Sequence, residues 1–158
     1  MIALEGSRIL VGVTGGIAAY KAPQLVRELR QAGADVQVVM TASAAEFVTA
    51  TTLQAVSGQP VRDTLWDATA EASMGHIELA RWADLILVAP ATADRLSRLA
   101  CGHADVLLGA LCLATRSPIA VAPAMNQVMW ESASTQRNLR TLKGDGVEVI
   151  GPEVGDQA

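Results

Sequence analysis

The most unusual stretch of the chain is APAMNQVMW, from Ala122 to Trp130. It places the amide side chain of Asn126 between Met125 and Met129, beside one of only three tryptophans. Thioether and indole groups give a polar group polarizable, apolar surroundings, so the pattern favours the rim of a binding pocket. Two alternatives stay open. Asn126 could simply cap a turn or a helix, and the methionines and the tryptophan could be ordinary core residues.

Histidine is the side chain best suited to accept a proton near neutral pH, and the chain has two. His76 lies in ASMGHIELARWAD, which predicts a helix that begins near the histidine. That helix is expected to bury Ile77, Leu79 and Trp82. His76 is therefore a candidate base, although a surface or capping role is the more common fate of such a residue. His103 has no comparable context and is expected at the surface.

A glycine loop, GVTGGIAAYK, follows the first apolar run of the chain. Gly15 and Gly16 would let the backbone approach a ligand closely, and the helix after them would point its N–H groups at an anion such as phosphate. The spacing matches neither the G-x-G-x-x-G dinucleotide motif nor a P-loop. A tight turn between strand and helix, without a ligand, is the alternative.

Two further loops carry hydroxyl groups. In MTASAAEF, Thr41 and Ser43 stand at the start of a helix, where they either act as helix caps or contact the same phosphate. In APATADRLSRLACG, the residues from Thr92 to Arg95 open another helix. The backbone there, with Thr92, could meet the polar edge of a ring held above the phosphate.

These loops must be positioned by a sheet. Near-continuous apolar runs of strand length predict strands at Arg8–Val13, Asp35–Met40, Asp84–Pro90 and Pro118–Pro123, with a weaker one at Gly146–Gly151. The run PQLVRELRQAG between the first two predicts a helix that buries Leu25, Val26 and Leu29 and stops at Gly33. Strands alternating with helices predict a parallel α/β sheet, in which ligands bind at the carboxyl ends of the strands.

The composition excludes several classes of protein. The chain has 158 residues, of which 51% are hydrophobic and 3% aromatic, enough for one globular domain. A net charge of −4 with scattered arginines leaves no basic stripe for nucleic acid. Cys101 and Cys112 fit no metal motif and are expected to be buried structural thiols, so no metal site is expected. The sequence shows no signal peptide and no apolar run long enough to cross a membrane. Together with reduced thiols, this predicts a cytoplasmic protein with no membrane partner.

Four stretches in fixed order, TGGIAAYK, GHIELARWAD, APATAD and PAMNQVMW, resemble the homo-oligomeric flavin-containing cysteine decarboxylases. The form PATAD, in place of the eukaryotic PASANT, favours the bacterial phosphopantothenoylcysteine decarboxylase branch. The resemblance covers nearly the whole chain. It implies a Rossmann-like (flavodoxin-like) three-layer α/β sandwich with a parallel sheet, FMN as cofactor, and a role in coenzyme A biosynthesis.

The resemblance also implies roles for individual residues. The reaction would be FMN-dependent oxidative decarboxylation of 4′-phospho-N-pantothenoylcysteine to 4′-phosphopantetheine. Asn126 would hold the substrate carboxylate with Met129 beside it, and His76 would act as the base during thiol oxidation, next to a flavin held largely by a neighbouring subunit. The implied cofactor contacts are, for the phosphate, Gly15, Gly16, Ile17, Thr41 and Ser43, and, for the isoalloxazine ring, Thr92, Ala93, Asp94, Arg95 and Ala124.

In the bacterial branch, the region of GPEVGDQA leads into a cysteine on a substrate clamp and then into a ligase domain. We therefore expect residues 1–158 to be a single flavin-binding decarboxylase domain, truncated before the clamp and without the ligase, whose turnover is incomplete. A mean hydropathy of +0.30 favours a homo-oligomer, and the resemblance implies trimers assembled into a dodecamer.

Two other functions fit the same motifs. A peptidyl-cysteine decarboxylase of this family would share the flavin and asparagine motifs and differ in its substrate clamp. A non-catalytic FMN-binding regulatory subunit is of another class, and such proteins typically lose the histidine or the asparagine. Because this chain has both His76 and Asn126, the decarboxylase is the favoured interpretation.

Overall fold

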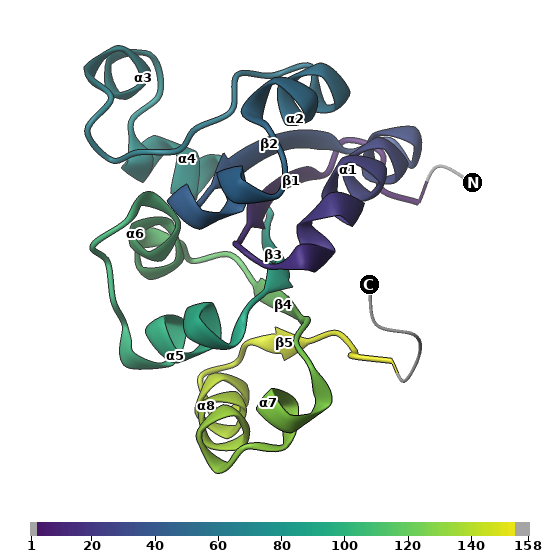
Figure 1. Cartoon of the computed structure of the whole chain (residues 1–158). Helices are drawn as coiled ribbons and strands as arrows, with labels where there is room; N and C mark the ends of the chain where they lie inside the picture. The colour runs from purple at the N-terminus through teal and green to yellow at the C-terminus, as the bar shows by residue number, and fades with distance from the viewer. Residues whose placement is uncertain (1–2, 154–158) are drawn as a thin grey trace.

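A five-stranded, all-parallel sheet forms the centre of the protein, seen in a computed structural model that describes residues 3–153, with the side chains of residues 71–73 excepted (Figure 1). The strand order is β2-β1-β3-β4-β5, which is the flavodoxin-like order. The strands are β1 (Arg8–Val13), β2 (Asp35–Met40), β3 (Leu85–Ala91), β4 (Ile119–Pro123) and β5 (Glu148–Val149). The predicted fold class is confirmed.

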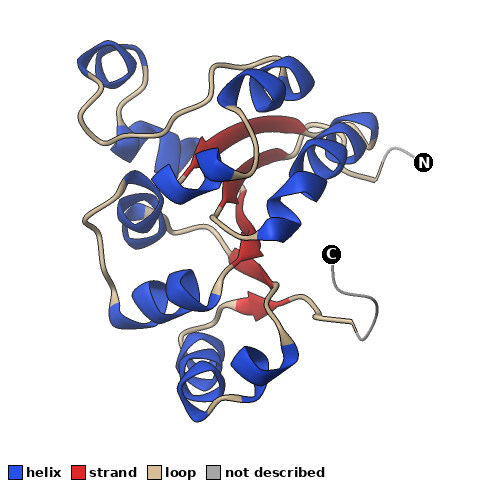
Figure 2. Ribbon diagram, in the orientation of Figure 1, coloured by secondary structure: helices blue, strands red, loops and turns tan. Residues whose placement is uncertain are grey.

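The helices lie on both faces of this sheet (Figure 2). On one face, Ala22 and Val26 of α1 and Leu53 of α2 pack on the sheet in one core cluster. On the other face, α4, α5, α6 and α8 bury leucines and alanines in a second cluster, which completes the three layers. The helical elements are η1 (Ile17–Lys21), α1 (Ala22–Gln31), η2 (Ala42–Glu46), α2 (Ala50–Ser57), α3 (Ala68–Ser73), α4 (His76–Trp82), α5 (Ala93–Cys101), α6 (Leu107–Ala114), α7 (Gln127–Glu131) and α8 (Ala133–Gly144), where η marks a 3-10 helix.

The apolar runs form the strands because both faces of the sheet are covered. In β1 every residue after Arg8 is buried, and in β3 every residue after Leu85 is buried. The fifth strand is shorter than predicted. Gly146 and Gly151 both have positive φ, so turns at its two ends leave only Glu148 and Val149 in the ladder at the sheet edge.

The first crossover matches its predicted pattern. Pro23 stands in the first turn of α1, where its missing N–H costs nothing, and Val26 is fully buried. Leu25 and Leu29 pack partly buried against the same cluster. Gly33, with φ of 101°, ends the helix.

The segment between α2 and α4 makes an arm that projects from the sheet, with α3 at its tip (Figure 1). The arm begins at Arg62, whose backbone forms an isolated parallel bridge with Val39 of β2. Leu65 and Met74 pack partly buried against the second core cluster. Among residues 3–153, no helix combines the length and the apolar character needed to cross a bilayer.

Two helical glycines provide a matched test of packing. A Cβ atom on Gly109 of α6 would lie 2.3 Å from the backbone oxygen of His103. We expect Gly109→Ala to lower the free energy of unfolding by about 1–3 kcal/mol, because this overlap can be relieved only by moving backbone. Gly144 of α8 has no atom within 4 Å of the same position, so Gly144→Ala should change it by less than about 1 kcal/mol. Urea denaturation measures both, and equal losses would contradict the packing described.

Candidate functional site

The loops that follow β1 and β3 are tied together by one buried hydroxyl. Thr14, directly after β1, is 1% exposed. Its Oγ1 donates to the carbonyl oxygen of Pro90 and accepts from the backbone N–H of Thr92 at 3.2 Å. Sequence reasoning did not single out Thr14, although a hydroxyl between a strand end and paired glycines was the available signal.

The glycine loop lies between the other two predicted loops. A Cβ atom on Gly15 would come within 2.3 Å of the Oγ of Ser43, and one on Gly16 within 3.3 Å of the Cγ2 of Thr92. Only glycine allows this approach at position 15. The structure therefore brings Gly15, Gly16, Ser43 and Thr92 together at the carboxyl edge of the sheet, as the sequence predicts.

Two short 3-10 helices begin at this edge without side-chain caps. Gly16, which has no side chain, precedes Ile17 at the start of η1. Thr41 precedes η2, and its side chain accepts no hydrogen bond from that helix. The Oγ1 of Thr41 lies 3.3 Å from the Oγ of Ser43 instead. Because the first N–H groups of a helix have no partner within it, both starts can donate to an anion, and the capping alternative does not hold for the Thr41 hydroxyl.

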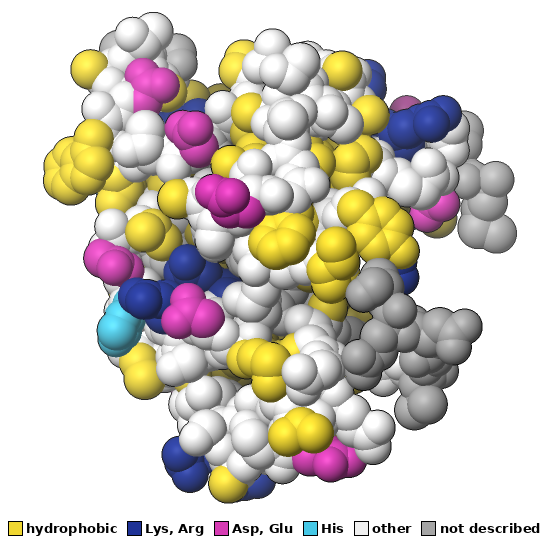
Figure 3. All heavy atoms as spheres, in the orientation of Figure 1, with side chains coloured by type: hydrophobic (Ala, Val, Ile, Leu, Met, Phe, Trp, Pro, Cys, Tyr) yellow, Lys and Arg dark blue, Asp and Glu magenta, His cyan; other side chains and the backbone are white. Residues whose placement is uncertain are grey.

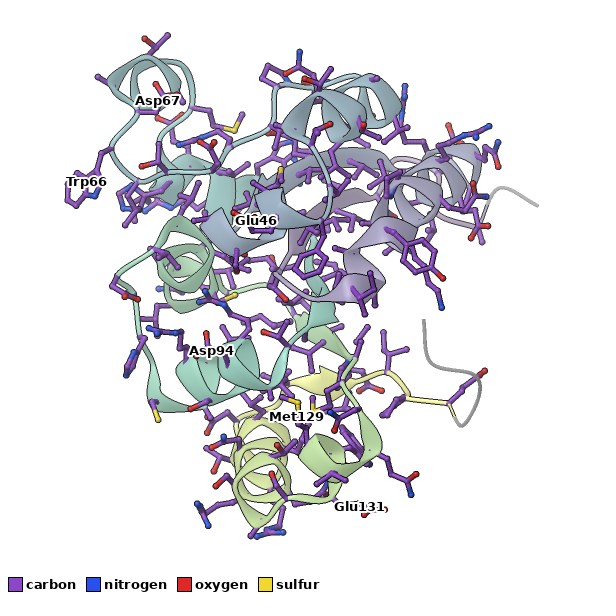
Figure 4. The ribbon with its side chains drawn as sticks, in the orientation of Figure 1. Glu46, Trp66, Asp67, Asp94, Met129 and Glu131 are labelled. Atoms are coloured by element: carbon purple, nitrogen blue, oxygen red, sulfur yellow. The ribbon has the colours of Figure 1, made fainter. Side chains whose placement is uncertain are left out.

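The polar side chains at the start of α5 have different partners. Thr92 caps the helix by accepting from the N–H of Arg95 at 3.1 Å. The carboxylate of Asp94, marked in Figure 4, pairs with Arg98 at 3.0 Å and is largely exposed. Arg95 is 6% exposed, and its Nε and Nη1 have no acceptor among the described residues. Burial lowers the pKa of this guanidinium.

Ala124 joins the same edge from β4. Its backbone N–H donates to the carbonyl oxygen of Ala91 at 3.1 Å, which fixes the loop after β4 beside the loop after β3. The loop that carries Asn126 is therefore held next to the loop that carries Thr92.

Asn126 is an exposed residue that caps α7. Its Oδ1 accepts from the N–H of Met129 at 2.8 Å. Because a backbone N–H needs an oxygen there, the orientation of the amide is fixed, and Nδ2 points away with no acceptor in the described part of the chain. Met129, also marked in Figure 4, is 46% exposed, whereas Met125 and Trp130 pack partly buried against the core.

His76 lies apart from this cluster of loops. It is the half-buried first residue of α4, and α4 packs on α6. In Figure 1, α4 and α7 are well separated. Leu79 is fully buried as predicted, but Ile77 is 43% exposed. The prediction for Ile77 was wrong because the buried stripe of this short helix runs through Leu79 and Ala80.

Two surface hollows lie away from these loops. One is lined by the ends of α1 and α2, including Arg27 and Val56, and the other includes Asp35 and Trp82. Both are at the amino ends of the strands, where parallel sheets rarely bind ligands. Within residues 3–153, no group of three His, Cys, Asp or Glu side chains is placed to hold a metal ion.

The fold and this cluster of loops define an α/β protein with glycines and hydroxyl groups gathered at the carboxyl edge of its parallel sheet. Residues 3–157 match the family model described as Flavoprotein, and the chain belongs to that family. It is 56% identical over 157 residues to the coenzyme A biosynthesis bifunctional protein CoaBC of Escherichia coli, covering 99% of this chain and 39% of that protein. It is 58% identical to CoaBC of Vibrio vulnificus, with 100% and 39% covered.

Solved structures of flavin-dependent cysteine decarboxylases are similar to this chain in fold and in sequence. A mutant PPC decarboxylase complexed with pantothenoylaminoethenethiol has a TM-score of 0.81 and 34% identity, with 94% of this chain and 84% of that chain covered. The FMN-dependent cysteine decarboxylase SpaF has a TM-score of 0.87 and 33% identity, with 98% and 88% covered. The chain spans about two fifths of the length of the CoaBC proteins.

The two cysteines differ in exposure, which gives a direct test. Cys101 is exposed, so its predicted burial was wrong: it stands at the solvent-facing end of α5. Burial raises the pKa of Cys112 to about 12. Since the thiolate is the reactive form, we expect Cys101 alone to react with a thiol reagent at pH 8, and Cys112 only after unfolding. Because the folded state holds the Cys112 proton more tightly than the unfolded state, the protonated thiol contributes fully to stability below pH 9. This contribution falls as the pH rises toward 12.

Counting modified thiols by mass spectrometry measures this difference. The Cys101→Ser variant is the control and should take up no reagent while folded. Two modified cysteines per folded chain would contradict the buried position of Cys112.

Proposed function

We propose that this chain binds FMN and catalyses the oxidative decarboxylation of 4′-phospho-N-pantothenoylcysteine to 4′-phosphopantetheine in coenzyme A biosynthesis. The observation that carries the proposal is the close approach of Gly15 to Ser43, which builds a cradle that any other side chain at position 15 would fill. The identity to CoaBC proteins supports the pathway. A solved relative that holds pantothenoylaminoethenethiol supports the substrate class.

The cradle fits a phosphate group. The N–H groups at the starts of η1 and η2, from Ile17 on one side and from Ser43 on the other, would donate to the phosphate oxygens, and Gly15 and Gly16 would leave room for them. The hydroxyl of Ser43 would add a further donor, with the Thr41 hydroxyl beside it. No lysine is needed, because several backbone dipoles converge on the same point.

The ring of the cofactor would lie above the start of α5. The backbone of Ala93 and Asp94, together with Thr92 and Ala124, would border it, and the buried Arg95 has two donors that still need an acceptor. When bound, FMN would accept two electrons from the thiol-bearing carbon of the substrate, so that the resulting thioaldehyde can take up the electron pair released with CO₂.

Asn126 would hold the substrate carboxylate. Its Oδ1 is committed to the cap of α7, so Nδ2 is the atom presented to a ligand. A neutral donor is suited to an anion that leaves as neutral CO₂, since a cation would stabilise the ground state more than the transition state. The exposed side chain of Met129 would cover the reacting carbon and exclude water.

His76 would accept the proton during thiol oxidation, in the site of a neighbouring copy of the chain. The separation of α4 from α7 supports this arrangement (Figure 1). Exposed apolar residues also support assembly: Trp66 is 87% exposed, Val128 78% and Leu113 61%. Figure 3 shows hydrophobic side chains on the face of the molecule in view. The proposal includes trimers that form a dodecamer, a fused ligase domain in the complete protein, and a cytoplasmic location.

Two alternatives rank lower. A peptidyl-cysteine decarboxylase would be expected to resemble EpiD, a variant of which was solved with a substrate peptide, more than CoaBC, yet the identity is 25% to EpiD and 58% to CoaBC. A regulatory flavoprotein without activity would have no need for both His76 and Asn126.

Cofactor binding depends on the glycine cradle. We expect Gly15→Ala to weaken FMN binding at least a hundredfold, or about 3 kcal/mol, because its methyl group would overlap Ser43. Gly16→Ala should weaken it less, since its nearest contact would be 3.3 Å from a methyl group of Thr92. Fluorescence titration of apoprotein with FMN measures both, and Gly144→Ala serves as the unaffected control. Unchanged affinity in Gly15→Ala would refute the cradle.

The reaction itself is tested by anaerobic mixing of flavin-loaded protein with phosphopantothenoylcysteine. We expect the visible absorbance of the flavin to bleach, with one CO₂ released per flavin. His76→Asn should keep the flavin but abolish bleaching, because the proton acceptor is lost. Asn126→Asp keeps the capping oxygen and removes the donor, so it should fold and bind FMN yet slow bleaching at least a hundredfold.

The outcomes separate the candidates. A bound flavin that does not bleach in the parent protein at any substrate concentration would favour the regulatory subunit. Bleaching by a peptide ending in cysteine, but not by phosphopantothenoylcysteine, would favour the peptidyl-cysteine decarboxylase.

A further inference from the structure

Arg62 is fixed to the outer edge of the sheet by its backbone. Its N–H donates to the carbonyl of Val38 at 3.1 Å, and its own carbonyl accepts from the N–H of Met40 at 2.8 Å. These two bonds are the isolated bridge beside β2. The arm that leads to α4 therefore starts from a rigid point, although its tip projects away from the sheet (Figure 1).

The side chain of the same residue holds the other end of the arm. Nη1 of Arg62 donates to the backbone carbonyl of Met74, twelve positions later in the chain. Between the two lie the exposed Trp66 and α3, which has its own cap at Asp67. One arginine thus closes the base of the arm, with its backbone at the beginning and its guanidinium at the end.

The held carbonyl is two residues before His76. Helix α4 begins at His76 with Gly75 in the cap position and no side-chain cap. By contrast, α2, α3, α5, α7 and α8 each start with a side chain that accepts a helix N–H. Helix α4 therefore starts without a side-chain cap, and the hydrogen bond from Arg62 to the carbonyl of Met74 restrains the chain two residues before the histidine.

We propose that Arg62 is a positioning residue, which sets the place and orientation of His76 by holding the carbonyl of Met74. The inference rests on the proposed function, in which His76 takes the proton. Hydrogen bonds from a charged guanidinium are stronger than those between neutral groups, so one such bond can restrain a whole turn. A displacement of about 1 Å in a reacting group can cost up to about a hundredfold in rate.

The experiment compares variants of one side chain. Arg62→Met keeps most of the length and removes the donor, Arg62→Gln keeps a polar group that is too short, and Arg62→Lys keeps a long donor. Arg30→Met is the matched control, because Nη1 of Arg30 also donates to a backbone carbonyl, that of Val56 at 2.8 Å, at the other end of the sheet.

Three quantities are measured: the rate constant of flavin bleaching at saturating substrate, the half-saturating substrate concentration, and hydrogen exchange of the amides in α4. We expect the flavin of Arg62→Met and Arg62→Gln to bleach about ten to a hundred times more slowly than in the parent protein. The half-saturating substrate concentration and the affinity for FMN should stay within twofold of the parent values. Arg62→Lys should recover at least half of the lost activation free energy. Exchange at Leu79, whose N–H donates to Gly75, should rise about tenfold, while exchange at Leu96 in α5 stays constant.

The outcomes distinguish this inference from the function on which it rests. If the parent protein does not bleach, the proposed function fails, and the exchange rates at Leu79 alone decide whether Arg62 holds α4. If the parent bleaches and both Arg62→Met and Arg62→Gln match it within twofold, the inference is overturned. It is overturned equally if Arg30→Met slows bleaching as much as they do, or if substrate half-saturation rises in step with the loss of rate.

Discussion

The geometry of the binding edge depends on the buried hydroxyl of Thr14. It makes one hydrogen bond to Pro90 at the end of β3 and one to Thr92 directly after that strand, and its own backbone leads straight into the paired glycines. A buried hydroxyl left without partners costs about 1–3 kcal/mol, so the two loops keep one fixed separation. The close approach of Gly16 to Thr92 follows from that separation. Two loops from two strands are therefore arranged by a group that a ligand need not touch.

Much of the fold could be predicted from the sequence, because burial on both faces of a parallel sheet requires continuous apolar runs. The runs that became β1 and β2 have their predicted bounds. The predictions were weakest where burial is partial. Ile77 and Cys101 look like core residues in a one-dimensional pattern, yet each stands on the exposed side of a short helix. The edge strand β5 was overestimated for a related reason, since its flanking glycines turn the chain before the ladder can lengthen.

The sequence predicted which loops form the site, but it did not predict the hydrogen bonds between them. The hydroxyls and glycines follow strand ends in the sequence, and topology alone brings such loops to one edge. The partner of each hydroxyl depends on distances between loops, which no sequence pattern encodes. Thr14, the link between two loops, was missed for this reason, and so was Arg62, whose role appears only when residues twelve positions apart are seen to meet.

In the proposed enzyme Asn126 would have two tasks, and they would fall on different atoms. The oxygen serves the fold by capping α7, and the nitrogen faces outward. Natural selection for stability acts only on the oxygen, which Asp, Ser or Thr can also supply. A lineage relieved of selection for chemistry can therefore lose the nitrogen by drift and keep an equally well-folded protein. On this fold, descendants that bind a ligand but no longer transform it are expected to arise easily and to persist.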